Sequence, residues 1–200
     1  MPQTPDEFLN LLQPHYCDAL QYCRALCHHP DEAQDLLQQS LVQALEKLPG
    51  LREPAKFKSW YFKIITRTFY RQCRQKFWRR FLPLPATVPE TQLELPPVFP
   101  ENDEPANERK NRLLHGLAQL KPKERAALLL FELGNFSIPD IAEIQEENSL
   151  SAIKSRLSRT RQKLKELILA AEKNNVNPQN YTGDLTDETK KLAAAFSGRR

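Results

Sequence analysis

Residues 57–80 (FKSWYFKIITRTFYRQCRQKFWRR) combine cationic side chains with aromatic rings, a mixture that can bind nucleic acid. Lys and Arg recur through residues 52–80, where the only acidic residue is Glu53. Cations of this kind neutralise phosphates, and aromatic faces stack on unpaired bases. We therefore predict a surface that binds opened nucleic acid. The alternative, a solvated basic face over aromatic residues of the core, stays open from this stretch alone.

This stretch contains no Pro and no Gly, which predicts a helix. Four cations follow one another at helical steps and therefore share one face: Lys63, Arg67, Arg71 and Arg74. Trp60, Ile64 and Thr68 mark a different stripe of the same helix. Such a helix can dock an apolar side while its other side offers charge.

A second candidate site is a helix-turn-helix near the C-terminus. Ser137 and Asp140 resemble a capping box at the start of a short helix over residues 137–144. A polar turn over residues 146–149 leads into a long helix over residues 150–171. We expect the apolar residues of the two helices to pack inward: Ile141, Ala142, Leu150, Ile153, Leu157 and Leu164.

The opposite face of the long helix then offers small residues and cations, which suit a major groove. These candidate contacts are Ser151, Ala152, Lys154, Ser155, Arg156 and Arg159. An ordinary helical hairpin with a charged exterior is the alternative. The turn, the cap and the excess of cations favour DNA binding.

The remaining pattern predicts an all-α fold of two small helical domains joined by a Pro-rich acidic linker. We expect a first helix over residues 5–27 and a second over residues 32–48, with Asp31 as its N-cap. Helices over residues 111–120 and 122–133 precede the helix-turn-helix. The predicted boundaries are 1–81 and 109–171 for the domains, 82–108 for the linker and 172–200 for a polar tail, in which a short helix over residues 187–196 is plausible.

The helix over residues 32–48 carries a polar face of one acid and three amides: Asp35, Gln38, Gln39 and Gln43. It could solubilise the helix or dock a protein partner, and the helix alone leaves both open. No run approaches the length of a membrane span, and the N-terminus has no secretory pattern. We therefore expect a cytoplasmic protein without membrane insertion.

The distribution of functional groups argues against an enzyme and against a cofactor. Paired carboxylates occur, but no nucleophile–base set and no Gly-rich phosphate loop accompany them. Cys23 and Cys27 precede two histidines, so a metal or redox site is conceivable; ordinary buried thiols are the better interpretation, and we predict no metal.

Four short motifs, in order, resemble those of bacterial extracytoplasmic-function (ECF) sigma factors of the sigma-70 family. Residues 35–45 (DLLQQSLVQAL) are similar to D-L-V-Q-E-T-F-x-x-A-L, and residues 57–64 (FKSWYFKI) to F-x-x-W-L-Y-x-I. Residues 120–125 (LKPKER) are similar to L-P-x-x-x-R. Residues 141–144 (IAEI) and 153–159 (IKSRLSR) are similar to I-A-E-x and V-K-S-R-L-x-R. The resemblance covers roughly residues 5–170 and includes a linker in the expected place.

This resemblance implies a transcription initiation factor whose partners are core RNA polymerase and promoter DNA. The polar face of residues 32–48 would then bind the polymerase clamp, and the loop over residues 49–56 would capture a flipped base of the −10 element. Contacts to the −10 DNA would come from Lys56, Lys58, Trp60, Tyr61, Lys63, Arg67, Arg71 and Arg74. The candidate contacts on the long helix over residues 150–171, which is the second helix of the helix-turn-helix, would bind the −35 element.

Three features depart from the family pattern. Arg67 stands where the family commonly has Asn, and Arg71 where it often has Asp, so both add positive charge. The turn of the helix-turn-helix is one residue longer than usual and lacks the usual Gly. Many ECF sigma factors are held inactive by an anti-sigma factor, and the sequence leaves that partner open. The alternative function is a helix-turn-helix regulator that acts without sigma activity.

Overall fold

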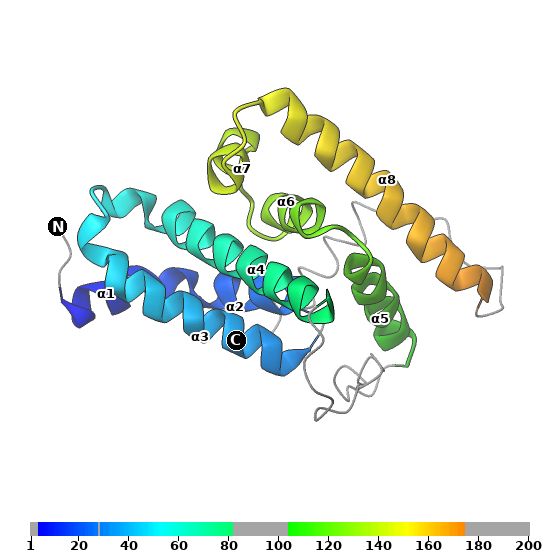
Figure 1. The fold of residues 1–200 in the computed structure, drawn as a ribbon, viewed down its shortest axis with the longest axis horizontal. Helices are drawn as coiled ribbons and strands as arrows, with labels where there is room; N and C mark the ends of the chain where they lie inside the picture. Colours follow the sequence, from blue (N-terminus) through cyan, green and yellow to red (C-terminus); the bar gives the residue numbers. More distant parts are fainter. Residues whose placement is uncertain (1–3, 28, 82–103, 175–200) are drawn as a thin grey trace.

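The protein, seen in a computed structural model that describes residues 4–27, 29–81 and 104–174, consists of helices joined by short loops in these ranges and has no strand there (Figure 1). Its N-terminal unit consists of α1 (Pro5–Leu12), α2 (Tyr16–Leu26), α3 (Pro30–Lys47) and α4 (Phe57–Phe81). Its C-terminal unit consists of α5 (Glu104–Ala118), α6 (Pro122–Glu132), α7 (Ile138–Gln145) and α8 (Leu150–Asn174). The predicted all-α class with two helical units is confirmed. The helix predicted over residues 187–196 lies outside the described residues.

The prediction of one helix over residues 5–27 is wrong. A 3₁₀ turn, η1 (Gln13–His15), separates α1 from α2. Pro14 lies in this turn, where it lacks an N–H for the helical ladder and its ring clashes with the preceding turn. Asp31 is not the N-cap of α3, because the helix begins at Pro30 with His29 as its N-cap. Pro suits the first helical position, since its fixed φ is already helical.

The core of the N-terminal unit forms where the aromatic residues of α4 face α2 and α3. Phe57, Tyr61 and Phe62 are each at most 1% exposed. The hydroxyl groups of Tyr22 on α2 and Thr66 on α4 are hydrogen bonded at 2.9 Å in this core. Burial of these rings fixes the rotation of α4 about its axis, so the remaining faces of α4 point outward or toward the C-terminal unit.

The C-terminal unit is built on close packing of α8 against α5, α6 and α7. Gly116 on α5 lets α8 approach, because a Cβ atom there would lie 2.8 Å from Leu164 Cδ1. α5 begins at Glu104, inside the segment predicted as linker, so helical order starts earlier than the sequence indicated. The predicted capping box of α7 is confirmed, with Ser137 and Asp140 bonded reciprocally.

Glu124 ties the start of α6 to α8. Its Oε2 accepts hydrogen bonds from the backbone N–H of Lys121 at 3.1 Å and from Lys163 Nζ at 3.2 Å. Burial acts to raise the pKa of Glu124, but these two hydrogen bonds and the charges of the two lysines bring the pKa below its ordinary value. The carboxylate form therefore stabilises the packing of α6 against α8.

The two units are in direct contact. α7 and α6 pack against α4, and α2 packs against α6. Figure 1 shows α6 and α7 lying between α4 and α8. Arg125 of α6, only 6% exposed, donates from Nη1 to the carbonyl oxygen of Leu26 in α2 at 2.7 Å. The surface of the N-terminal unit that α4 presents is therefore partly covered by the C-terminal unit.

Candidate nucleic-acid interface

The predicted cationic face of α4 exists in the structure, but its members differ in what they contact. Arg67, Arg71 and Arg74 are exposed, whereas Lys63 is half-buried. Lys63 and Arg67 form ion pairs with Glu146, the C-cap residue that follows α7. Of the two arginines that depart from the family pattern, Arg67 therefore contacts the C-terminal unit, and Arg71 is exposed.

The remaining predicted −10 contacts divide between surface and core. Lys56 is exposed and pairs with Glu53 at 3.1 Å. Lys58 Nζ donates to the carbonyl oxygen of Gly134 at 3.0 Å. Tyr61 is fully buried, and burial raises the pKa of its phenol well above the ordinary range. In this structure the Tyr61 ring supports α4 from within and presents no face to solvent.

Trp60 occupies an intermediate position that suits stacking. Its ring packs 5.7 Å from that of Phe57 and remains half-buried. A pocket of about 240 Å³ opens beside it, lined by α4, the loop over residues 50–53 and Glu143 and Ile144 of α7. Its lining includes Arg52, Lys56 and Lys63, three cations that can hold a phosphate next to the indole. Gly50, Arg52 and Lys56 in its lining belong to the loop over residues 49–56, to which the family resemblance assigns capture of a flipped base.

The polar face of α3 proves to have two parts. Asp35 and Gln38 are exposed. Gln43 Nε2 donates to Thr68 Oγ1 of α4 at 3.0 Å, and Gln39 Oε1 accepts from Gln72 Nε2 at 3.2 Å. Two amides of the predicted partner face, Gln39 and Gln43, therefore also link α3 to α4 by hydrogen bonds.

Two exposed apolar residues on α3 were not among the predicted site residues. Val42 is 57% exposed and Leu45 is 45% exposed. Together with Asp35 and Gln38 they follow helical steps along one stripe. That spacing was available in the sequence and could have identified them, because an apolar residue in register with a polar face is a common sign of a docking surface.

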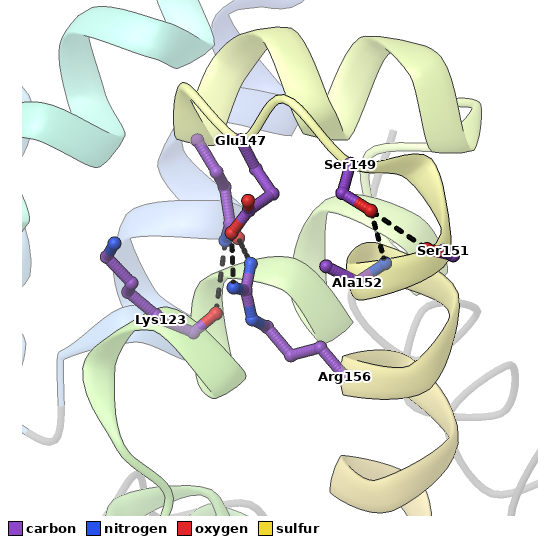
Figure 2. Close-up of polar contacts among 7 residues, drawn as sticks. Lys123, Glu147, Ser149, Ser151, Ala152 and Arg156 are labelled. Carbon is purple, nitrogen blue, oxygen red and sulfur yellow. Dashed lines mark hydrogen bonds and ion pairs between the residues drawn. The ribbon is translucent and has the colours of Figure 1, made fainter.

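Arg156, which was predicted from the sequence to contact the −35 element, instead stabilises the turn of the helix-turn-helix by hydrogen bonds (Figure 2). Arg156 Nη1 donates to Gln145 Oε1 at 2.7 Å, and Nη2 pairs with Glu147 Oε2 at 2.8 Å. Gln145 in turn donates from Nε2 to the carbonyl oxygen of Lys123 at 3.0 Å. The hydrogen bond from Arg156 lowers the pKa of Glu147, although burial opposes the shift. Arg156 points into the turn and away from the outer face of α8.

Ser149 begins α8 by accepting a hydrogen bond from the Ala152 N–H at 3.2 Å, and its hydroxyl also contacts that of Ser151 (Figure 2). Four of the predicted −35 contacts share the outer face and are exposed: Ser151, Lys154, Ser155 and Arg159. Ala152 is half-buried beside them. Leu150, predicted to pack inward, is 47% exposed, because it is the first helical residue and precedes the packed turns of α8.

Cys23 and Cys27 are buried thiols. Burial raises the pKa of Cys27 to about 12 and that of Cys23 further, so neither thiol is a ready nucleophile. Within residues 4–27, 29–81 and 104–174, no cluster of three or more His, Cys, Asp or Glu side chains could bind a metal ion. In the same ranges no helix has the length and hydropathy needed to span a bilayer.

Comparison with known proteins connects these two surfaces to one family. The family described as Sigma-70 region 2 matches residues 11–79, and the family described as Sigma-70, region 4 matches residues 110–164. The first match contains α3 and most of α4, and the second contains the whole turn of the helix-turn-helix. Both candidate surfaces thus fall inside sigma-70 regions.

Two relatives match the chain over most of their own length. The chain is 29% identical over 160 residues to the RNA polymerase sigma factor YlaC of Bacillus subtilis (strain 168), covering 80% of this chain and 91% of the relative. It is 22% identical over 165 residues to the ECF RNA polymerase sigma factor SigW of the same organism, covering 80% of this chain and 88% of SigW.

Two solved structures have a similar fold. The sigma factor RpoE of Bartonella quintana, solved with the anti-sigma factor NepR, superposes with a TM-score of 0.58 at 23% identity over 84% of this chain and 97% of RpoE. CnrH, solved with the cytosolic domain of CnrY, superposes with a TM-score of 0.59 at 20% identity over 84% of this chain and 92% of CnrH. The chain belongs to the sigma-70 family and is an ECF sigma factor, which directs promoter-specific initiation of transcription.

Proposed function

We propose that the two helical units of this sigma factor bind two separate promoter elements, while α3 binds core RNA polymerase. The observation that carries this proposal is the presence, in one chain, of a basic and aromatic helix and an exposed helix-turn-helix face, each within its sigma-70 region. We assign residues 1–81 to polymerase binding and the −10 element, and residues 109–171 to the −35 element.

At the −35 element, α8 enters the major groove with its N-terminal turns. Ser151, Ala152 and Ser155 are small, so the backbone can come close to base edges. Lys154 and Arg159 are exposed beside them and can reach guanine acceptors or phosphates. Arg156 acts indirectly, because its hydrogen bonds to Gln145 and Glu147 hold the turn in the conformation that exposes the outer face of α8.

At the −10 element, α4 and the adjoining loop hold the opened strand. Trp60 stacks on a base, while Lys56, Lys58 and Lys63 neutralise nearby phosphates, supported by the pocket that three of these side chains line. Arg67, Arg71 and Arg74 continue the charge along the helix. Binding of the unpaired bases offsets the free energy needed to unstack them, which is on the order of a few kcal/mol. Tyr61 contributes indirectly, because its buried ring supports α4 from within the core.

The polymerase clamp binds the exposed stripe of α3. Asp35 and Gln38 supply polar contacts, and Val42 and Leu45 supply the apolar centre that the polar residues alone lack. Gln39 and Gln43 extend this surface and also join α3 to α4, so polymerase binding at α3 and strand binding at α4 involve two hydrogen-bonded helices.

The sigma-70 family is not known for enzymatic activity, and we propose that this chain has none: binding energy drives promoter opening. We place its action in the cytoplasm, together with core polymerase and promoter DNA. An anti-sigma factor is a further proposed partner, supported by the complex of the structurally similar RpoE with NepR.

Reconstitution with core polymerase tests this function. The purified chain should co-migrate with core enzyme on a sizing column, and the holoenzyme should start transcripts at a defined set of genomic sites. Mapping those transcripts supplies the promoter sequences. Absence of association at low salt, or initiation no more selective than that of core enzyme alone, would refute the proposal.

A further inference from the structure

The C-terminal end of α4 carries two exposed aromatic rings. Phe77 is 57% exposed and Trp78 is 63% exposed, the largest fraction among the large apolar side chains that the structure describes. Their ring centres lie 6.3 Å apart, with the ring planes at 81°. A single exposed apolar residue is ordinary on a protein surface, whereas two adjacent large rings on one helix indicate a contact with a partner.

Trp78 lies in register with the cationic face of α4. This face consists of Lys63, Arg67, Arg71 and Arg74, and Trp78 comes four residues after Arg74. Side chains at steps of three and four share one face of a helix, so the indole extends the cationic face by one turn. Arg71 and Arg74 are themselves exposed. The most exposed ring of the described chain therefore lies beside two accessible cations.

The packing of α4 against α3 fixes the direction in which Trp78 points. Gln72 Nε2 donates to Gln39 Oε1 of α3 at 3.2 Å, and Lys76 forms an ion pair with Glu32 of α3. Residues 72 and 76 thus share the side of α4 that faces α3. Trp78 follows two residues later, about 200° around the helix, and lies on the opposite side. The contacts with α3 therefore hold the indole toward solvent.

Cations beside an exposed ring suit an unpaired nucleic-acid strand. The guanidinium groups neutralise phosphates, and the ring stacks on a base that has lost its neighbour. Bases inside a duplex are already stacked on each other, so a duplex offers the indole no free base face. A protein partner would need an apolar centre, whereas Trp78 continues a row of positive charges. Charge complementarity and continuity with the cationic face of α4 both favour single-stranded DNA.

We propose that Trp78 is a second base-stacking residue of this sigma factor, at the C-terminal end of α4, and binds a nucleotide whose phosphates contact Arg71 and Arg74. This inference rests on the proposed function of α4. At a rise of 1.5 Å per residue, Trp78 lies about 27 Å along the helix axis from Trp60, so the two indoles bind different nucleotides. The surface that binds the opened strand then runs along most of α4.

Tryptophan fluorescence tests the stacking directly. The chain has two Trp residues, so Trp60→Phe leaves Trp78 as the only indole. Stacking on a base quenches indole emission, whereas charge neutralisation alone does not bring a base to the ring. The probes are an oligothymidylate of about 20 nucleotides and inorganic polyphosphate of similar charge, each added at low salt. We expect quenching by oligothymidylate alone, and an equal response to both probes would overturn the stacking.

The effect on affinity is measured with Trp78→Ala in the full chain. Fluorescence anisotropy of a labelled oligothymidylate should show binding weakened by about 5- to 30-fold, the range expected when one stacked base loses its ring. Trp78→Phe should restore most of that loss. Because Trp78 is exposed, the melting temperature should stay unchanged. Affinity for the matching duplex should stay within about twofold, and an equal loss on duplex and single strand would overturn the preference for unpaired bases.

Leu9→Ala is the matched control, because it removes an apolar side chain of α1 that is 57% exposed. Equal losses for Leu9→Ala and Trp78→Ala would show a general surface effect and overturn the inference. Unchanged binding by Trp78→Ala, beside measurable wild-type binding, would overturn the inference and leave the assignment of the strand to α4 intact.

Two further outcomes separate the inference from the function on which it rests. Failure of the wild type to bind oligothymidylate would overturn both the assignment of the strand to α4 and the role of Trp78. Loss of co-migration with core polymerase in Trp78→Ala, at unchanged affinity for oligothymidylate, would assign the ring to a protein contact and overturn the inference alone.

Discussion

Arg156→Ala is expected to destabilise the helix-turn-helix, whereas Arg159→Ala is expected to weaken promoter binding and leave stability unchanged. The two arginines lie three residues apart on α8 and were assigned to the same role from the sequence. The structure separates them, since the Arg156 side chain is 18% exposed and bonded into the turn, while Arg159 is exposed.

The magnitude for Arg156 follows from what its removal leaves behind. Gln145 is 6% exposed, and its Oε1 would lose the donor that lies 2.7 Å away. An unsatisfied buried acceptor costs about 1–3 kcal/mol. For a unit of this size, each kcal/mol lowers the melting temperature by about 4–8 °C. Arg156→Lys should also melt early, because a single ammonium group cannot replace the planar fork that spans two acceptors.

For Arg159 the expected loss is in affinity. A side chain that reads a base contributes about 1–3 kcal/mol, or about 5- to 150-fold, at its cognate site and less on random duplex. Its removal should change stability by less than about 0.5 kcal/mol. Thermal melts followed by circular dichroism at the helical band, with anisotropy titrations on a mapped promoter and on random duplex, measure both quantities.

Two results would contradict this division of roles. Equal melting temperatures for Arg156→Ala and the wild type would show that the turn does not depend on the Arg156 bonds. Equal affinity losses for Arg159→Ala on promoter and random duplex would reduce Arg159 to a phosphate contact.

Three further predictions concern other parts of the chain. Val42→Asp should abolish co-migration with core polymerase while the melting temperature of the free protein stays unchanged; retained co-migration would argue against the α3 stripe. Tyr22→Phe should lower the free energy of unfolding by about 1 kcal/mol in a denaturant titration, because the bond to Thr66 is lost; a Thr66→Val background should abolish that difference. The lowered pKa of Glu124 means that its stabilising effect is present above the unfolded pKa and is lost as pH falls through the folded pKa; melts from about pH 6 to about pH 3 should show a smaller decline for Glu124→Gln than for the wild type.

Local patterns in the sequence were sufficient for most helices. The capping box at Ser137 and Asp140 and the absence of Pro and Gly from residues 57–80 act within a few residues, so the start of α7 and the length of α4 followed directly. The predicted helix over residues 5–27 is wrong because Pro14 interrupts the helical hydrogen bonds although the apolar stripe continues past it. His29 replaced Asp31 as a cap, since Pro30 already fixes a helical φ.

Site residues were harder to assign, because charge and aromaticity do not reveal which way a side chain points. Tyr61 and Trp60 are neighbours in a basic aromatic stretch, yet one is buried and the other lines a pocket. In the sequence Val42 and Leu45 resemble ordinary apolar residues of a helix, and only the packing of α3 in the structure shows that they are exposed. In each case the rotation of a helix against its neighbours decides the role.

The sequence by itself determined the all-α class, the positions of the two sigma-70 regions and the cationic helix of the first, because helical periodicity, caps and charge are local properties. Only the tertiary structure decided that Arg156 holds a turn while Arg159 is exposed, and that Glu146 lies against Lys63 and Arg67. Glu146 and Arg67 are far apart along the chain, and their contact depends on how two independently recognisable units pack. No local pattern encodes that packing, which follows from burial of groups such as Phe136 and Arg125 between the units.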